Sequence, residues 1–272
     1  MFKMGEFMSE FNEQMKSVLI DLKYNYNVIG VKAEYEDEGA TESDVIALKD
    51  LVQECGLNLT LKIGGCGAVK DLYDAQMIGA KNIVAPMIET PYSLVKFAEI
   101  IDRVFSHEEI ERKKFLINIE TISGYNNLED IINSDAFSKI SGIVLGRSDM
   151  TKSLGLSKDY VNSSALMNIA FNISSKMKVL NKNFIVGGNV SSKSLKFFKN
   201  LPYITGFETR KIIFDSSVIN SDKCEEGILK ALKFEILWLQ HKRERCNAMS
   251  EEDAVRIQHL KETYNDILSA MS

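Results

Sequence analysis

Histidine and closely spaced cysteine, the usual zinc ligands, are scarce in this chain. It has three histidines and four cysteines among 272 residues, and no two cysteines have the short spacing of a zinc site. The cysteines are expected to be free thiols in a reducing compartment. Each histidine lies in a charged, helix-like segment where solvated surface is its expected place, so the sequence offers no convincing histidine base for catalysis.

Long apolar runs and an excess of positive charge are also missing. The formal net charge is -5 and the pI is near 5.4, with Lys and Arg scattered among Asp and Glu, which disfavours a nucleic-acid partner. No segment approaches the roughly 20 apolar residues of a membrane-spanning helix. Residues 1–22 carry Glu and Lys throughout instead of the apolar core of a signal peptide. We therefore expect a cytoplasmic protein with no nucleic-acid partner and no membrane partner.

Proline is rare as well, and the chain instead alternates strand-like and helix-like segments. Seven short runs are β-branched or apolar and continuous rather than alternating, which is typical of strands buried on both faces. They are NVIGVKAEY (27–35), LNLTLKI (57–63), NIVAPMI (82–88), FLINI (115–119), GIVLG (142–146), NFIVGG (183–188) and YITGFE (203–208). Helix-period segments separate them, which predicts a parallel sheet. Seven such units fit a (β/α)8 TIM barrel better than an open doubly wound sheet of about five or six strands.

The eighth strand of that barrel is not obvious. Either the barrel is irregular at its first strand, where a helix-like segment precedes residue 27, or KIIF (211–214) is a separate short strand. After residue 222 the pattern changes to two helices. We predict a catalytic barrel with an N-terminal helix over residues 1–222 and a C-terminal helical extension over 223–272. The extension either covers its own barrel or docks on a neighbour, and we favour a homo-oligomer held through it.

Two acidic residues follow neighbouring strands of the predicted barrel. Glu120 ends FLINI, and Asp149 comes three residues after GIVLG. Reacting groups of a TIM barrel come from the C-terminal ends of its strands. Two carboxylates there, with water and a bidentate ligand, supply the oxygen shell that Mg2+ or Mn2+ prefers. Alternatively, each carboxylate pairs with a lysine or arginine such as Lys62, and spacing alone does not decide between the two.

Taken together, several motifs resemble a known family. NIVAPMIET, INIETISGYNNLEDI, GIVLGRSDMTKSLG and IVGGNVS stand in the order found in the aldolase/citrate lyase β-subunit family, which includes the 4-hydroxy-2-oxoheptanedioate aldolases (HpcH/HpaI type). The similarity spans residues 28–212. It implies a TIM barrel that binds Mg2+ or Mn2+ through Glu120 and Asp149 and stabilises a pyruvate-type enolate. It also implies that backbone N–H groups of the Gly146–Asp149 turn hold the carboxylate of a 2-oxo acid.

The chain departs from that family near the predicted site. Lys62 stands where the aldolases have an arginine, and Tyr35 where they have the histidine of a Glu-His pair. Acid-base catalysis therefore falls to Glu34, Glu36, Tyr35 or Lys32, with the two glutamates favoured. The candidate catalytic side chains are Glu34, Glu36, Lys62 and Arg210. The candidate substrate-binding residues are Lys32, Lys62, Gly146, Arg147 and Ser148.

Two further expectations concern charges near these candidates. Asp37 and Glu38 are expected to lie in a solvated acidic loop. Arg210 is expected either to neutralise a substrate carboxylate or phosphate, or to pair with Glu208.

Three hypotheses about function follow. The leading one is a class II, metal-dependent carbon–carbon lyase or aldolase acting on a 2-oxo acid or related carboxylate through an enolate. The second keeps the fold but uses a CoA thioester or a phosphoenolpyruvate-type substrate, as relatives of citrate lyase do. The third is a barrel that binds a metabolite without turnover.

Overall fold

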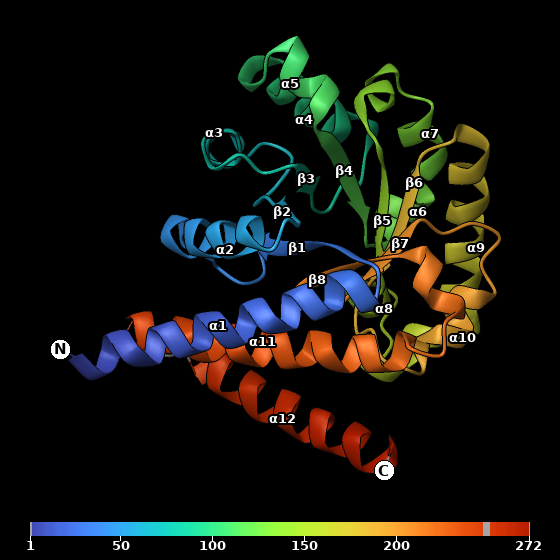
Figure 1. Cartoon of the computed structure of the whole chain (residues 1–272). Coiled ribbons are helices and arrows are strands. Elements are labelled where there is room, and N and C mark those ends of the chain that lie inside the picture. Colours follow the sequence, from blue (N-terminus) through green and yellow to red (C-terminus); the bar gives the residue numbers. More distant parts are fainter. Residues whose placement is uncertain (1, 247–250, 272) are drawn as a thin grey trace.

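Eight strands close into a barrel in the computed structural model, which describes residues 2–246 and 251–271 (Figure 1). Each strand pairs with its neighbours in chain order, and the seven predicted strands are all present. The strands are β1 (Val28–Glu34), β2 (Asn58–Lys62), β3 (Asn82–Ala85), β4 (Lys114–Ile119), β5 (Gly142–Gly146), β6 (Asn183–Gly187), β7 (Gly206–Glu208) and β8 (Ile212–Asp215). The TIM-barrel prediction is therefore confirmed.

The eighth strand, β8, runs against the other seven. It corresponds to the KIIF segment and pairs antiparallel with both β7 and β1, whereas β1 to β7 are parallel. Only Thr209, Arg210 and Lys211 lie between β7 and β8, and a parallel pair needs a crossover of about a dozen residues or more. The short connection therefore forces a hairpin, whose tip lies at the end of the barrel where β1 to β7 finish.

Helices surround the barrel in the intervals between strands. They are α1 (Phe2–Asn25), α2 (Glu42–Glu54), α3 (Val69–Ile78), α4 (Pro91–Val104), α5 (His107–Arg112), α6 (Ile122–Asn126), α7 (Leu128–Ile132), α8 (Arg147–Ser153), α9 (Ser164–Leu180), α10 (Ser194–Lys199), α11 (Cys224–Cys246) and α12 (Glu251–Met271). Thr41 and Thr90 begin α2 and α4 with capping boxes, and Pro91 at the first position of α4 reinforces its start. None of the described helices is long and apolar enough to cross a membrane.

The last two helices differ in how they attach to the barrel. α11 lies beside α1 along the β8–β1 flank (Figure 1) and adds Phe234 and Trp238 to the main hydrophobic core. α12 packs on α11 through a small separate cluster that includes Ile257 and Leu260. α11 is therefore integral to the barrel's packing, while the predicted division at residue 222 and the predicted homo-oligomer stay predictions.

The interior of the barrel is apolar at one level and charged at the next. Val84, Leu116 and Val144 form a small cluster separate from the core under the helices. Side chains alternate between the two faces of a strand, so Asn118 and then Glu120 follow Leu116 on the inward side of β4. The charged level opens at the C-terminal ends of β1 to β7. We call this end, with the β7–β8 tip and the first turn of α8, the mouth.

Candidate active site

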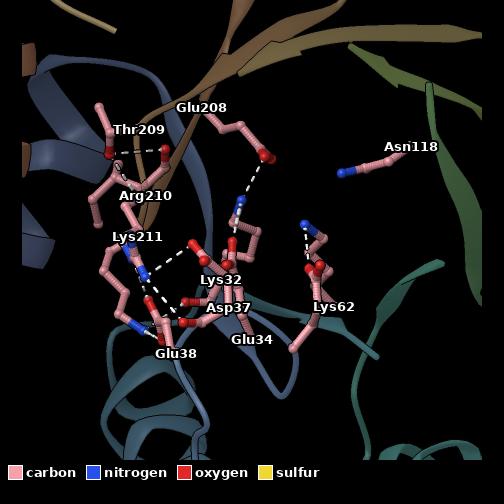
Figure 2. A network of polar contacts seen from close by, with 12 residues as sticks. Lys32, Glu34, Asp37, Glu38, Lys62, Asn118, Glu208, Thr209, Arg210 and Lys211 are labelled. Atoms are coloured by element: carbon pink, nitrogen blue, oxygen red, sulfur yellow. Dashed lines mark hydrogen bonds and ion pairs between the residues drawn. The ribbon is translucent and has the colours of Figure 1, made fainter. Parts of the chain in front are cut away.

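Three buried charged side chains meet at the centre of the mouth. Lys32 Nζ lies 2.6 Å from Glu34 Oε1 and 2.6 Å from Glu208 Oε1 (Figure 2). Glu208 packs against Gly187, where a Cβ would lie 3.0 Å from its Cγ. Burial alone would raise the pKa of Glu34, but the charges of Lys32 and Lys62 outweigh it and lower that pKa to about 2. Glu34 is thus ionised but a weak base, which argues against its predicted catalytic role.

Lys62, at the end of the neighbouring strand β2, contacts two further carboxylates. Its Nζ lies 2.7 Å from Glu36 Oε2 and 3.6 Å from Glu120 Oε2. Burial lowers the pKa of both Lys62 and Lys32, but the surrounding carboxylates outweigh burial and raise both pKa values. Both lysines are therefore protonated, and neither is the neutral amine that forms a Schiff base.

The mouth-facing residue of the β1–α2 loop is Glu36 rather than Tyr35. Tyr35 packs into the core under the helices, and burial together with Asp74 and Asp71 raises the pKa of its phenol. Glu36, one residue further, pairs with Lys62 while 29% of its side chain stays exposed. Of the acid-base candidates, Glu36 alone combines access to the mouth with a contact to Lys62.

Glu120 is enclosed at the end of β4. Its Oε1 accepts a hydrogen bond from the Met87 N–H at 3.0 Å, and its Oε2 accepts one from Asn118 Nδ2 at 2.7 Å. A Cβ at Gly146 would lie 2.6 Å from Glu120 Oε2, so only glycine fits there. Burial raises the pKa of Glu120 more than Lys62 and these hydrogen bonds lower it. Glu120 therefore lies against the start of the turn that carries Asp149.

An acceptor beside Glu120 has no partner. Asn118 is 4% exposed, and its Oδ1 makes no hydrogen bond although its amide group donates to Glu120. A buried unsatisfied acceptor costs about 1–3 kcal/mol. One signal in the sequence points to this residue, since Asn118 is the only polar side chain within the run FLINI.

Asp149, the second predicted metal ligand, lies in the first turn of α8. Its side chain is 36% exposed and pairs with Lys152 at 2.9 Å. Glu120 and Asp149 thus follow the neighbouring strands β4 and β5, and each contacts a lysine. Within residues 2–246 and 251–271, no group of three or more His, Cys, Asp or Glu side chains could hold a metal. The two carboxylates offer the oxygen donors that Mg2+ or Mn2+ prefers, so the donor chemistry fits a cation that takes its other ligands from water and substrate.

Arg147 has a different environment from the one expected for a substrate-binding residue. It is fully buried, and its guanidinium lies over the rings of Phe197 and Phe198. Its N–H groups donate to oxygen atoms at the end of β6 and in the segments that follow β6 and α8, namely those of Gly187, Gly188, Val161, Asn162 and Ser194. No donor is left for a substrate. Arg147 holds the loops after β5 and β6 together, which corrects its predicted role.

The backbone of the same turn lies close to a glycine. Gly188 has φ +83°, and a Cβ there would lie 2.4 Å from Ser148 N and 2.7 Å from Arg147 N. Glycine is therefore required at this position, both for its positive φ and for the close approach of the loop after β6 to the start of α8.

The acidic loop after β1 is tied to the β7–β8 tip. Arg210 contacts Asp37 at 3.0 Å and Glu38 at 3.2 Å, and Lys211 also pairs with Glu38 (Figure 2). The expected solvated loop is therefore wrong for Glu38, whose side chain is 12% exposed. Arg210 does not pair with Glu208, which contacts Lys32 instead.

Both the sequence and the fold of this chain are similar to those of known proteins. The family model of the HpcH/HpaI aldolase/citrate lyase family matches residues 47–181. No curated protein sequence matches the chain. Among solved structures, an HpcH/HpaI aldolase from Desulfitobacterium hafniense DCB-2 is 9% identical, with 72% of this chain and 82% of that chain covered and a TM-score of 0.57.

Two other solved structures are similar in fold. An HpcH/HpaI aldolase/citrate lyase family protein from Burkholderia cenocepacia J2315 is 10% identical, with 82% and 90% coverage and a TM-score of 0.58. The citrate synthase SbnG is 12% identical, with 80% and 89% coverage and a TM-score of 0.55. At these identities the likeness shows the fold alone.

The closed barrel and the matched family point to one class of protein, the TIM-barrel lyases and aldolases that act on carbon–carbon bonds. Residues 47–181 match the HpcH/HpaI aldolase/citrate lyase family, as the motifs of the chain predict. This match supports a lyase or aldolase function.

Proposed function

We propose that this protein is a divalent-cation-dependent carbon–carbon lyase or aldolase that acts on a 2-oxo acid through a pyruvate-type enolate. The observation that carries the proposal is the enclosed Glu120 carboxylate beside the unsatisfied Asn118 Oδ1. Family members are generally dependent on a divalent metal. Mg2+ or Mn2+ is the cofactor we propose.

Glu120 and Asp149 would hold the cation. The charges around them favour it, because two lysines inside the mouth face four carboxylates: Lys32 contacts Glu34 and Glu208, and Lys62 contacts Glu36 and Glu120. A divalent cation would balance that excess. When bound, it supplies Lewis-acid stabilisation of the negative charge that develops on the keto oxygen.

The chain's own groups would orient the substrate and move the proton. Backbone N–H groups of the Gly146–Asp149 turn are the proposed donors to the carboxylate of the 2-oxo acid. Glu36 is the proposed base that removes a proton from C3, and its contact with the Lys62 ammonium holds its carboxylate in place. In the synthetic direction, C3 then bonds to an aldehyde carbon and the carbonyl oxygen takes up a proton. Cleavage is the reverse, so no oxidant or reductant is needed.

Calorimetric titration with Mn2+ followed by oxalate, a mimic of the pyruvate enolate, tests the cation site directly. We expect Mn2+ to bind the wild type and oxalate to bind only after Mn2+. A second measurement follows deuterium exchange at the pyruvate methyl group by NMR, which reports enolate formation without any acceptor. Borohydride trapping of a pyruvate adduct on Lys62 would contradict the proposal and indicate a Schiff-base enzyme.

A barrel that binds a metabolite without turnover is the competing hypothesis. The pairing of both proposed ligands with lysines favours it, because a cation must displace Lys62 and Lys152 from them. Absence of Mn2+ and oxalate binding would support this alternative. A substrate panel of free acids, CoA esters and phosphorylated acids tests the citrate-lyase-like alternative in the same assay.

A further inference from the structure

The charged side chains of the mouth carry an excess of negative charge. The carboxylates are Glu34, Glu36, Asp37, Glu38, Glu120, Asp149 and Glu208, and the cations paired with them are Lys32, Lys62, Lys152, Arg210 and Lys211. Seven carboxylates thus face five cations. Arg147 is not part of this set, because its guanidinium is buried among neutral oxygen atoms and two phenyl rings.

This excess limits how many anionic groups a substrate can bring. One divalent cation balances the charges of these paired side chains, and the carboxylate of one 2-oxo acid makes the total negative again. A second anionic group would then enter a site of its own sign, which is unfavourable. The conclusion does not depend on which partner each cation takes, because exchanging ion pairs leaves the total unchanged.

The hydrogen-bonding groups of the mouth point to the same kind of ligand. Ionised carboxylates only accept hydrogen bonds, and the side chains of Asp37, Asp149 and Glu36 are 61%, 36% and 29% exposed. Asn118 Oδ1, buried at the base of the mouth, also lacks a donor. An ionised 2-oxo acid has no donor to offer, whereas a hydroxyl group does.

We infer that the second reactant, the aldehyde that adds to the enolate or leaves it, is a neutral and hydroxylated molecule such as a short polyol aldehyde. The inference rests on the proposed function and specifies its substrate class. C3 of the 2-oxo acid loses a proton to Glu36 and bonds to the aldehyde carbon. The carbonyl π electrons become an alkoxide that takes up a proton, giving a hydroxylated 4-hydroxy-2-oxo acid.

A panel of aldehydes tests this inference with the Mn2+-loaded protein and pyruvate. Glyceraldehyde is neutral and hydroxylated, propionaldehyde is neutral without a hydroxyl, and succinic semialdehyde is anionic. We expect kcat/KM for glyceraldehyde to exceed that for each of the other two by roughly 10-fold or more. Added salt should reduce the difference in kcat/KM between glyceraldehyde and succinic semialdehyde, because salt screens repulsion between exposed charges.

A charge change at the rim of the mouth provides a second readout. Asp37→Lys should raise kcat/KM for succinic semialdehyde several-fold relative to kcat/KM for glyceraldehyde. Glu108→Lys is the matched control, because Glu108 is similarly exposed but lies on α5, which precedes β4 and so lies toward the opposite end of the barrel. This control should leave the aldehyde preference as it is.

The outcomes separate the inference from the proposed function. Deuterium exchange together with equal or faster turnover of succinic semialdehyde overturns the inference and leaves the proposed function standing. Equal turnover of propionaldehyde overturns the assignment of a hydroxylated reactant. Absence of exchange overturns the proposed function, and the inference with it.

Discussion

The β4–β5 side and the β8–β1 side of the mouth differ in how their charged side chains are paired. On the β4–β5 side, Glu120 and Asp149 each contact one lysine, and Asn118 Oδ1 has no partner. On the β8–β1 side, Lys32 joins two carboxylates, and the β7–β8 tip pairs with the acidic loop. A buried charge is tolerated when it is paired or holds a metal.

The difference indicates that the two sides of the mouth have different roles, one in stability and the other in binding. The β8–β1 side is internally paired, so removing a member there leaves other buried charges without partners. The β4–β5 side has a hydrogen-bond acceptor without a partner, Asn118 Oδ1, which suits a site that binds a cation and substrate. We therefore expect substitutions on the first side to affect stability and those on the second to affect binding and catalysis.

The largest expected effect concerns the β4–β5 side. Glu120→Gln and Asp149→Asn should each lower Mn2+ affinity and activity by more than the roughly 10- to 100-fold that loss of an outer partner costs. Both variants should stay folded, because each substitution keeps the size of the side chain. Calorimetric titration, activity and circular dichroism measure the three quantities. Unchanged Mn2+ affinity in both variants would remove the cation site from the β4–β5 side.

Lys32→Met tests the paired side by stability. It leaves Glu34 and Glu208 buried without their shared cation, and breaking such a buried network costs about 3–5 kcal/mol. Lys62→Met is the comparison: it should cost less, because Glu36 is partly exposed, but should lower activity more. Denaturant unfolding gives both free energies. Equal losses of stability in Lys32→Met and Lys62→Met would contradict the different roles of the two sides.

Two glycines provide a matched pair of small changes. An added Cβ would lie 2.6 Å from Glu120 Oε2 in Gly146→Ala, and 3.0 Å from Glu208 Cγ in Gly187→Ala. Gly146→Ala should lower Mn2+ affinity by about 10-fold by displacing a ligand. Gly187→Ala should cost about 1–3 kcal/mol of stability through crowding with little change in Mn2+ affinity. The reverse pattern would place the functional carboxylate on β7.

The smallest expected effect is on the pH dependence of stability. The pKa of Glu34 is lowered to about 2, so its contribution to stability is complete above the ordinary glutamate pKa of about 4.3 and is lost as the pH falls toward 2. Lys32→Met should flatten the acid limb of the stability curve in this window. Glu120→Gln should not, because the pKa of Glu120 is raised and its ionised form gives the fold no support.

Much of the fold was predictable because its signals are local. The runs FLINI and GIVLG are apolar throughout, as strands covered on both faces must be, and Glu120 follows the first of them. The direction of β8 was left open, since KIIF is too short to identify a strand by pattern. Its antiparallel pairing follows from the three-residue connection to β7.

Other features depend on residues far apart in the chain. Glu38 was expected in solvent because its neighbours in sequence are acidic, yet Arg210 and Lys211 lie more than 170 positions away and meet it at the mouth. Arg147 was expected to contact substrate because it lies in the GxxD turn. The rings of Phe197 and Phe198 and the carbonyl groups after β6 determine where its guanidinium lies instead.

Hydrophobic runs and the residues that end them lie along the chain, and they are enough to predict the barrel class, the family resemblance and the two carboxylates at neighbouring strand ends. How the charges pair depends on contacts that form only when the chain folds. Barrel closure brings β8 beside β1 and turns Lys32, Glu34 and Glu208 into one buried network. That network separates the side of the mouth that stabilises the fold from the side left available for chemistry.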